Sequence, residues 1–144
     1  MEPDTVIKLA KKYKNIIGIK EAKGDLDQMN NLIKNKPPNF LIISGDDDTA
    51  AQSILNGADG VISVAAGSIP KLFIKTINYA LKKEERNTNA LSDLIKPYLK
   101  LLFNEGNPSG TKAALSILNL CENKLRLPLI PVSDSLYSKI EKFI

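Results

Sequence analysis

The chain has 144 residues, of which 43% are hydrophobic, and its 20 basic and 16 acidic side chains give a formal net charge of +4. This length and composition fit a globular protein with a real core. The absence of histidine excludes imidazole general-base catalysis, histidine metal ligands and Ser-His triads. A single cysteine, Cys121, excludes an intramolecular disulfide, which fits a reducing compartment.

The positive charge does not indicate a nucleic-acid partner. All but two of the basic residues are lysines, they are scattered along the chain, and aromatic residues make up only 6%. Nucleic-acid binders usually gather basic residues into a stripe with arginines or interleaved aromatics. No apolar run approaches the ~20 residues of a membrane span, and the N-terminus has no signal-peptide layout. We therefore expect a cytoplasmic location, with neither nucleic acid nor membrane as partner.

Helical and strand patterns alternate over the first part of the chain. After a helix that starts near Pro3, three apolar runs predict buried strands at residues 15–20, 40–44 and 60–64. Helical spacing follows each run, over residues 26–34, over residues 48–56 and from Pro70 onward. A βα unit repeated at roughly 20–25 residues predicts a parallel sheet whose strands are buried on both faces.

Strand patterns end near residue 82. A long helix is expected over residues 84–104, with a kink or break at Pro97. A helix over residues 111–120, an extended segment at 126–132 and a final helix capped by Ser133 follow. The predicted organisation is therefore an α/β part at residues 1–82 and an all-helical part at residues 83–144.

Lys20 is the first candidate functional residue, because it stands at the carboxyl end of the first apolar run. Side chains alternate along a strand, so Lys20 and Gly18 share one face while Ile19 and Glu21 share the other. The carboxyl ends of parallel strands are where α/β folds place their chemistry. The spacing alone also allows a lysine that only reaches from the sheet into solvent.

Three parallel strands leave a sheet incomplete. A closed barrel of βα units needs eight strands and about 250 residues, and the outer strands would present long hydrophobic edges. We therefore expect either completion by another chain or a swapped copy, or a chain that is the C-terminal portion of something longer.

Four sequence strings carry a resemblance to a known family. The strings are Ile16–Ala22, Ser44–Asp47, Gly57–Val64 and Arg126–Pro131. In the family's order and with matching gaps, they resemble the dihydrodipicolinate synthase (4-hydroxy-tetrahydrodipicolinate synthase) family of pyruvate-dependent class I aldolases, a superfamily that includes N-acetylneuraminate lyase. The resemblance implies an α/β fold made of the C-terminal three βα units of a (β/α)8 TIM barrel and a C-terminal helical subdomain.

The resemblance also implies roles for individual residues. Lys20 corresponds to the lysine that forms a Schiff base with pyruvate, and the derived enamine adds to an aldehyde, aspartate semialdehyde, on the route to lysine through diaminopimelate. Ile62 corresponds to a residue whose backbone carbonyl lies over the bound pyruvate, and Gly45 and Asp46 to the border of the pocket. Read from their spacing alone, Gly45 and Asp46 form a turn and a helix cap. No metal or cofactor is implied. Because a lysine attacks only as the neutral amine, a dry pocket is expected around Lys20.

The resemblance begins just before the family's sixth barrel strand. The threonines that hold the pyruvate carboxylate, the tyrosines of the proton relay and the arginine that recognises the semialdehyde have no counterpart. We therefore expect little or no turnover from the chain by itself. The open alternatives are a non-catalytic remnant, a half-barrel partner subunit, a homo-oligomer, and another pyruvate aldolase such as a sialic-acid or keto-sugar-acid lyase.

Three smaller sequence features are compared with the family's pattern or allow two interpretations. Lys23 departs from the family's small or hydroxyl residue, and it either adds positive potential near Lys20 or faces solvent. Gly67-Ser68, ahead of a helix, either binds an anion or forms a plain turn. Ser109-Gly110-Thr111 stands where many relatives have Ile-Pro-Val.

Overall fold

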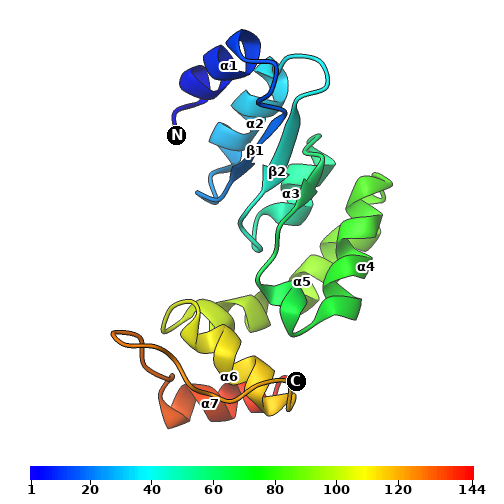
Figure 1. Ribbon diagram of the computed structural model, residues 1–144. Coiled ribbons are helices and arrows are strands. Elements are labelled where there is room, and N and C mark those ends of the chain that lie inside the picture. The colour runs from blue at the N-terminus through cyan, green and yellow to red at the C-terminus, as the bar shows by residue number, and fades with distance from the viewer. The chain divides into compact units, whose positions relative to one another are not determined.

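The computed structural model describes residues 1–144, and inter-residue contacts divide them into two compact units. The first unit comprises residues 1–63 and 76–89, and the second comprises residues 64–75 and 90–144. No helix combines the length and apolar character needed to cross a membrane. In chain order (Figure 1) the elements are α1 (Pro3–Lys12), β1 (Gly18–Glu21), α2 (Leu26–Asn35), β2 (Leu41–Ser44), α3 (Ala50–Leu55), β3 (Gly60–Val61), the 3-10 helix η1 (Ala65–Gly67), α4 (Pro70–Leu81), α5 (Glu85–Phe103), α6 (Ser109–Ile117) and α7 (Asp134–Glu141).

The strands of the first unit form one parallel sheet in the order β1-β2-β3. Ile43 of β2 pairs with Lys20 of β1 on one side and with Gly60 of β3 on the other. The predicted parallel pairing is thus confirmed. β3 is shorter than predicted, since the chain turns soon afterwards into η1, although the Ile62 N–H still donates to the Ser44 carbonyl at 2.9 Å.

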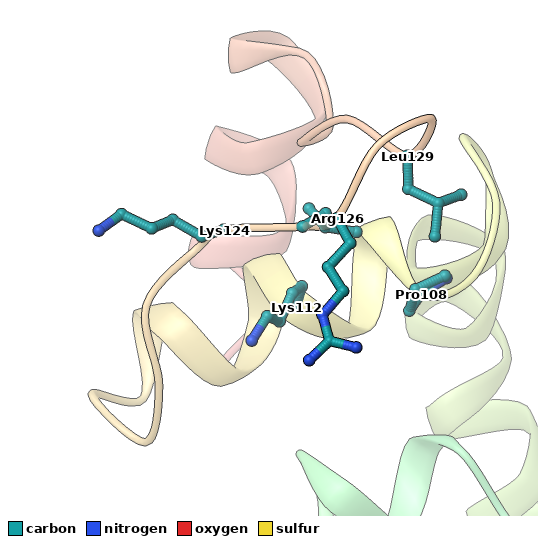
Figure 2. Close-up of a pocket in the computed structure, with 6 residues that line it drawn as sticks. Pro108, Lys112, Lys124, Arg126 and Leu129 are labelled. Atoms are coloured by element: carbon teal, nitrogen blue, oxygen red, sulfur yellow. The ribbon is translucent and has the colours of Figure 1, made fainter.

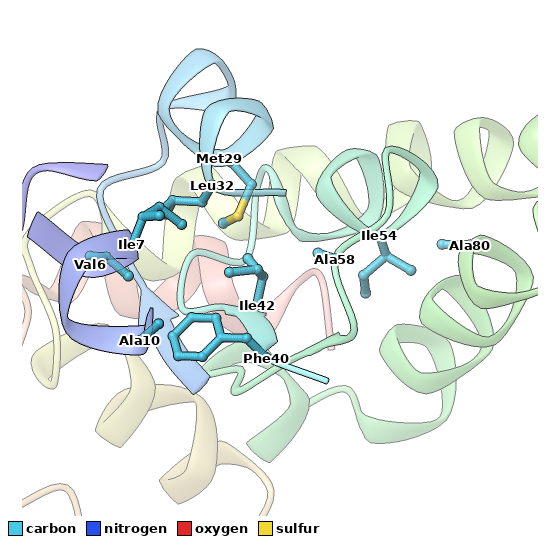
Figure 3. Packing of buried hydrophobic residues seen from close by; sticks show 10 residues of the cluster. All are labelled: Val6, Ile7, Ala10, Met29, Leu32, Phe40, Ile42, Ile54, Ala58 and Ala80. Carbon is cyan, nitrogen blue, oxygen red and sulfur yellow. The ribbon is translucent and has the colours of Figure 1, made fainter. Parts of the chain in front are cut away.

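Helices bury one face of this sheet. Ile42, at the centre of β2, is 0% exposed and lies in an apolar cluster that joins the sheet to its helices (Figure 3). The other members are Val6, Ile7 and Ala10 of α1, Met29 and Leu32 of α2, Phe40, Ile54, Ala58 and Ala80. The 3.6-residue spacing of the apolar positions in α1 and α2 supplies this contact.

The opposite face of the sheet is open. Leu41 is 42% exposed and Ile62 is 56% exposed. The expectation that the strands are buried on both faces is therefore wrong for this chain. The physical reason is that the first unit provides helices for one side only, so an apolar run suited to two-sided burial is half covered.

Asp59 anchors the connection that leads into β3. Its Oδ2 accepts hydrogen bonds from the Ile42 N–H at 2.8 Å and from Lys36 Nζ at 2.7 Å. Burial acts to raise the pKa of Asp59, but these two hydrogen bonds and the Lys36 charge outweigh it and hold the pKa below its usual value. The Asp59 carboxylate thus links the segment before β3 to β2 and to the segment before β2.

The second unit packs its helices around Tyr98. This side chain is fully buried, stacks on Phe143 with ring centroids 4.9 Å apart, and its hydroxyl shares a short hydrogen bond with Ser68. α5 continues through Pro97 as one helix, so of the predicted kink or break the break does not occur. Proline removes one backbone hydrogen bond, and the buried neighbours Ile95 and Leu99 hold the helix on both sides of it.

Candidate active site

Lys20 is the third residue of the four in β1, close to the strand's carboxyl end. Paired residues of neighbouring strands point to the same face, so Lys20 shares its face with Ile43 and Gly60. By alternation Leu41 and Ile62 belong to that face too. Lys20 therefore lies on the open face of the sheet, opposite the helix-covered core, where an approaching small molecule can reach its amine.

Gly45 leaves the space that the Lys20 side chain fills. A Cβ atom added to Gly45 would stand 2.6 Å from Lys20 Cε, 3.1 Å from Lys20 Cγ and 2.7 Å from Ala22 Cβ. The Gly45 N–H also donates to the Glu21 carbonyl at 2.7 Å, which fixes its backbone beside β1. The structure thus brings Gly45 and Lys20 into direct contact, and the glycine sets the path of the lysine's aliphatic stem.

Asp46 acts on the backbone rather than on Lys20. Its Oδ2 accepts hydrogen bonds from the Thr49 N–H at 2.9 Å and from Thr49 Oγ1 at 2.6 Å. The carboxylate also lies beside Gly24, where an added Cβ would stand 3.2 Å from Asp46 Cγ. This geometry confirms the turn but not the helix cap, because Thr49 is the N-cap of α3 and Asp46 only closes the turn before it. The turn brings the loops after β1 and β2 together at one end of the sheet.

The water-excluding environment expected around Lys20 is absent from this chain alone. Lys20 is exposed, as are Leu41 and Ile62 on the same face. The physical reason is the open face itself: no residue of the first unit covers the amine. Gly45 thus positions the Lys20 side chain, but no neighbouring residue shields its amine from water.

Lys23 faces solvent and pairs with a neighbouring carboxylate. Its Nζ forms an ion pair with Asp25 at 2.9 Å, and its side chain is mostly exposed. The hydrogen bond and charge of Asp25 raise the pKa of Lys23 and hold it as a solvated cation with a local counter-charge. Of the two interpretations offered for this residue, the solvent-facing one is confirmed.

Glu21 is the residue near the site that sequence reasoning missed. It is only 7% exposed and accepts hydrogen bonds from the Lys23 N–H at 2.9 Å and from Gln28 Nε2 at 2.8 Å. The strand alternation that directs Lys20 outward directs Glu21 toward the helices. The signal available in the sequence was a carboxylate on the buried side of a strand. Glu21 fixes the end of β1 against α2 through its hydrogen bond from Gln28.

The alternative anion site at Gly67-Ser68 is not supported. The Ser68 hydroxyl is buried, donates to the Ala65 carbonyl at 3.2 Å and is hydrogen-bonded to Tyr98. The segment is a structural turn of the second unit.

Comparison with known proteins gives one consistent result. The sequence model of the dihydrodipicolinate synthetase family matches residues 1–144. A 4-hydroxy-tetrahydrodipicolinate synthase from Azobacteroides pseudotrichonymphae is 43% identical over 142 residues, which are 99% of this chain and 48% of that protein.

Solved structures agree with the sequence match. The dihydrodipicolinate synthase of Thermotoga maritima superimposes with a TM-score of 0.94 at 32% identity, over 99% of this chain and 49% of that one. The Acinetobacter baumannii enzyme, crystallised with pyruvate, superimposes with a TM-score of 0.93 at 35% identity, over 99% and 48%. The chain spans about half the length of the relatives that it matches, and it belongs to the dihydrodipicolinate synthetase family.

Proposed function

We propose that this chain is the half of a pyruvate-condensing synthase that carries the Schiff-base lysine. In this proposal residues 1–82 are the last three βα units of a (β/α)8 barrel, and residues 83–144 are a C-terminal helical subdomain. The division follows the type of element. It differs from the division into two compact units described above, because α4 and α5 each have residues in both units.

The observation that carries the proposal is the placement of Lys20. Its amine stands at the carboxyl end of a parallel strand, on the open face, with its stem held against Gly45. The relative from A. baumannii was crystallised with pyruvate, which supports a keto acid as the molecule that meets this amine.

The proposed chemistry starts with attack of the neutral Lys20 amine on the carbonyl carbon of pyruvate. Loss of water gives an iminium, whose positive nitrogen withdraws electrons from the adjacent methyl carbon and makes it acidic. Loss of a proton from that carbon gives an enamine, which forms a carbon–carbon bond to the aldehyde carbon of aspartate semialdehyde. The relatives named above are synthases, which favours this aldehyde over the sugar acids of the sialic-acid lyases.

Further βα units complete the site in this proposal. Leu41, Ile43 and Ile62 form an apolar surface beside the exposed Lys20, and covering that surface would remove water from the amine. The covering part is either the five other βα units of a barrel, as part of one longer chain or as a separate half, or, as an alternative, another copy of this chain. Three strands from each of two copies fall short of the eight that a barrel requires, so the complementary half is the better fit.

Turnover measurements test this proposal. The chain alone is expected to convert pyruvate and aspartate semialdehyde at a negligible rate. Co-expression with the N-terminal half of the A. pseudotrichonymphae relative is expected to restore condensation, and Lys20→Arg in the same pair is expected to abolish it. Turnover by the isolated chain at the rate of a full-length relative would contradict the requirement for a second half.

A further inference from the structure

The second unit contains a pocket of about 310 Å³ that lies on residues with no role in the proposed reaction. Residues from the start of α6 and from the connection before α7 line it: Pro108, Lys112, Lys124, Leu125, Arg126 and Leu129. This volume lies at the lower end of the range for small-molecule sites. Three of the six lining residues are cations and the other three are apolar.

The cations and the apolar residues are segregated (Figure 2). The Lys112 and Arg126 side chains extend in the same direction, whereas Leu129 and Pro108 lie at the other end of the pocket. Lys124 extends away from both cations and is already paired with Glu122 at 2.7 Å. The wall of the pocket is mostly apolar, and the charged groups of Lys112 and Arg126 mark one end of it, the basic end.

The two cations at the basic end lack counter-charges. No carboxylate lies within 4.0 Å of the Lys112 or Arg126 side chain, and neither side chain makes a hydrogen bond within the chain. Lys112 is in the first turn of α6, a turn without acidic residues. The positive end of the helix dipole thus adds to two positive side chains. An anion bound here would meet two cations that have no counter-charge in the chain.

We propose that this pocket binds a small organic anion, with a carboxylate or phosphate between Lys112 and Arg126 and an apolar body against Pro108, Leu125 and Leu129. The guanidinium of Arg126 matches a two-oxygen anionic group through paired N–H donors, and Lys112 adds a point charge. The apolar end discriminates against plain inorganic ions, which bury no hydrophobic surface.

Phenyl phosphate is a suitable probe, since it combines the two features, and inorganic phosphate and benzyl alcohol each supply one of them. Titration of the ¹⁵N-labelled full chain, followed by backbone amide shifts, is expected to give changes confined to residues 109–112 and 124–129. Phenyl phosphate is expected to bind more tightly than either partial probe. Arg126→Gln and Lys112→Gln are each expected to weaken it about tenfold.

Lys100→Gln is the matched control, because it removes one positive charge from an exposed position of the same unit outside the pocket. It is expected to leave the affinity unchanged. The proposal is overturned if inorganic phosphate binds as tightly as phenyl phosphate, if the shifts lie elsewhere, or if the pocket variants lose no more affinity than the control. The amide spectrum of each variant reports whether it folds, and Lys112→Gln carries the test if Arg126→Gln does not.

Discussion

Gly45→Ala tests whether the glycine positions the lysine. The new Cβ would stand 2.6 Å from Lys20 Cε, about 0.8 Å inside the 3.4 Å at which ordinary van der Waals contact begins. The same atom would stand 2.7 Å from Ala22 Cβ, which cannot rotate away. We therefore expect the Lys20 stem to move by roughly 1 Å and the free energy of unfolding to fall by about 1–3 kcal/mol.

The functional consequence is larger than the loss of stability. A displacement of roughly 1 Å at a reacting group lowers rates by on the order of 10²-fold. The assay is the rate of pyruvate-dependent reductive trapping on Lys20, measured by mass spectrometry in the chain paired with its complementary half, at a temperature where both variants are folded. Urea denaturation of the same samples gives the change in stability separately.

Gly67→Ala is the control, because a Cβ there meets nothing within 4 Å. It is expected to change neither the trapping rate nor the urea midpoint beyond about 0.5 kcal/mol. If Gly45→Ala traps pyruvate on Lys20 as fast as Gly67→Ala does, the contact between Gly45 and Lys20 does not position the amine.

Two further predictions concern stability. Asp59→Asn weakens the hydrogen bond to the Ile42 N–H and removes the ion pair with Lys36, so we expect a loss of about 1.5–3 kcal/mol in urea denaturation at pH 7. Since the pKa of Asp59 in the folded chain lies below the ordinary value of 3.8, the stability from its charge is present above that value and is lost as the pH falls through the folded pKa. Equal urea midpoints for wild type and Asp59→Asn at pH 7 would contradict this reading. Gly110→Ala places a Cβ against the Leu102 backbone carbonyl, a contact that no side-chain rotation relieves, so a loss of about 3 kcal/mol is expected; a urea midpoint matching that of Gly67→Ala would refute the close approach of α5 and α6.

The sequence predicted those features of the site that depend on local pattern. The alternation of β1 placed Lys20 and Glu21 on opposite faces, and the strands are parallel as the βα repeat required. The turn closed by Asp46 follows from a short polar side chain three residues before Thr49. Each of these inferences needs only neighbours in the chain.

Features that depend on distant partners could not be predicted in this way. A continuous apolar run is typical of a strand buried on both faces, and it does not show whether the chain itself supplies both covers, so the exposure of Leu41 and Ile62 was not visible in the sequence. The end of β3 is set by the turn into η1 rather than by hydrophobicity. Lys112 and Arg126 meet in one pocket only because the connection before α7 folds back onto α6.

The departure at Ser109-Gly110-Thr111 gains a physical explanation from the structure. Ser109 Oγ donates to the Ile130 carbonyl at 2.7 Å, which ties the start of α6 to the connection before α7. Gly110 lets α6 approach the Leu102 backbone more closely than any residue with a side chain would allow. The substituted positions thus stabilise the packing of the helices in the second unit.

Reductive trapping with pyruvate and borohydride, followed by peptide mass spectrometry, tests the role of Lys20 most directly. The chain contains 18 lysines, the 20 basic residues less Arg86 and Arg126, so the site of modification is informative. In the chain paired with its complementary half, we predict that a reduced pyruvate adduct forms on Lys20 well ahead of the other lysines and disappears in Lys20→Arg. An adduct that is absent, or spread evenly over the surface lysines, would contradict the assignment.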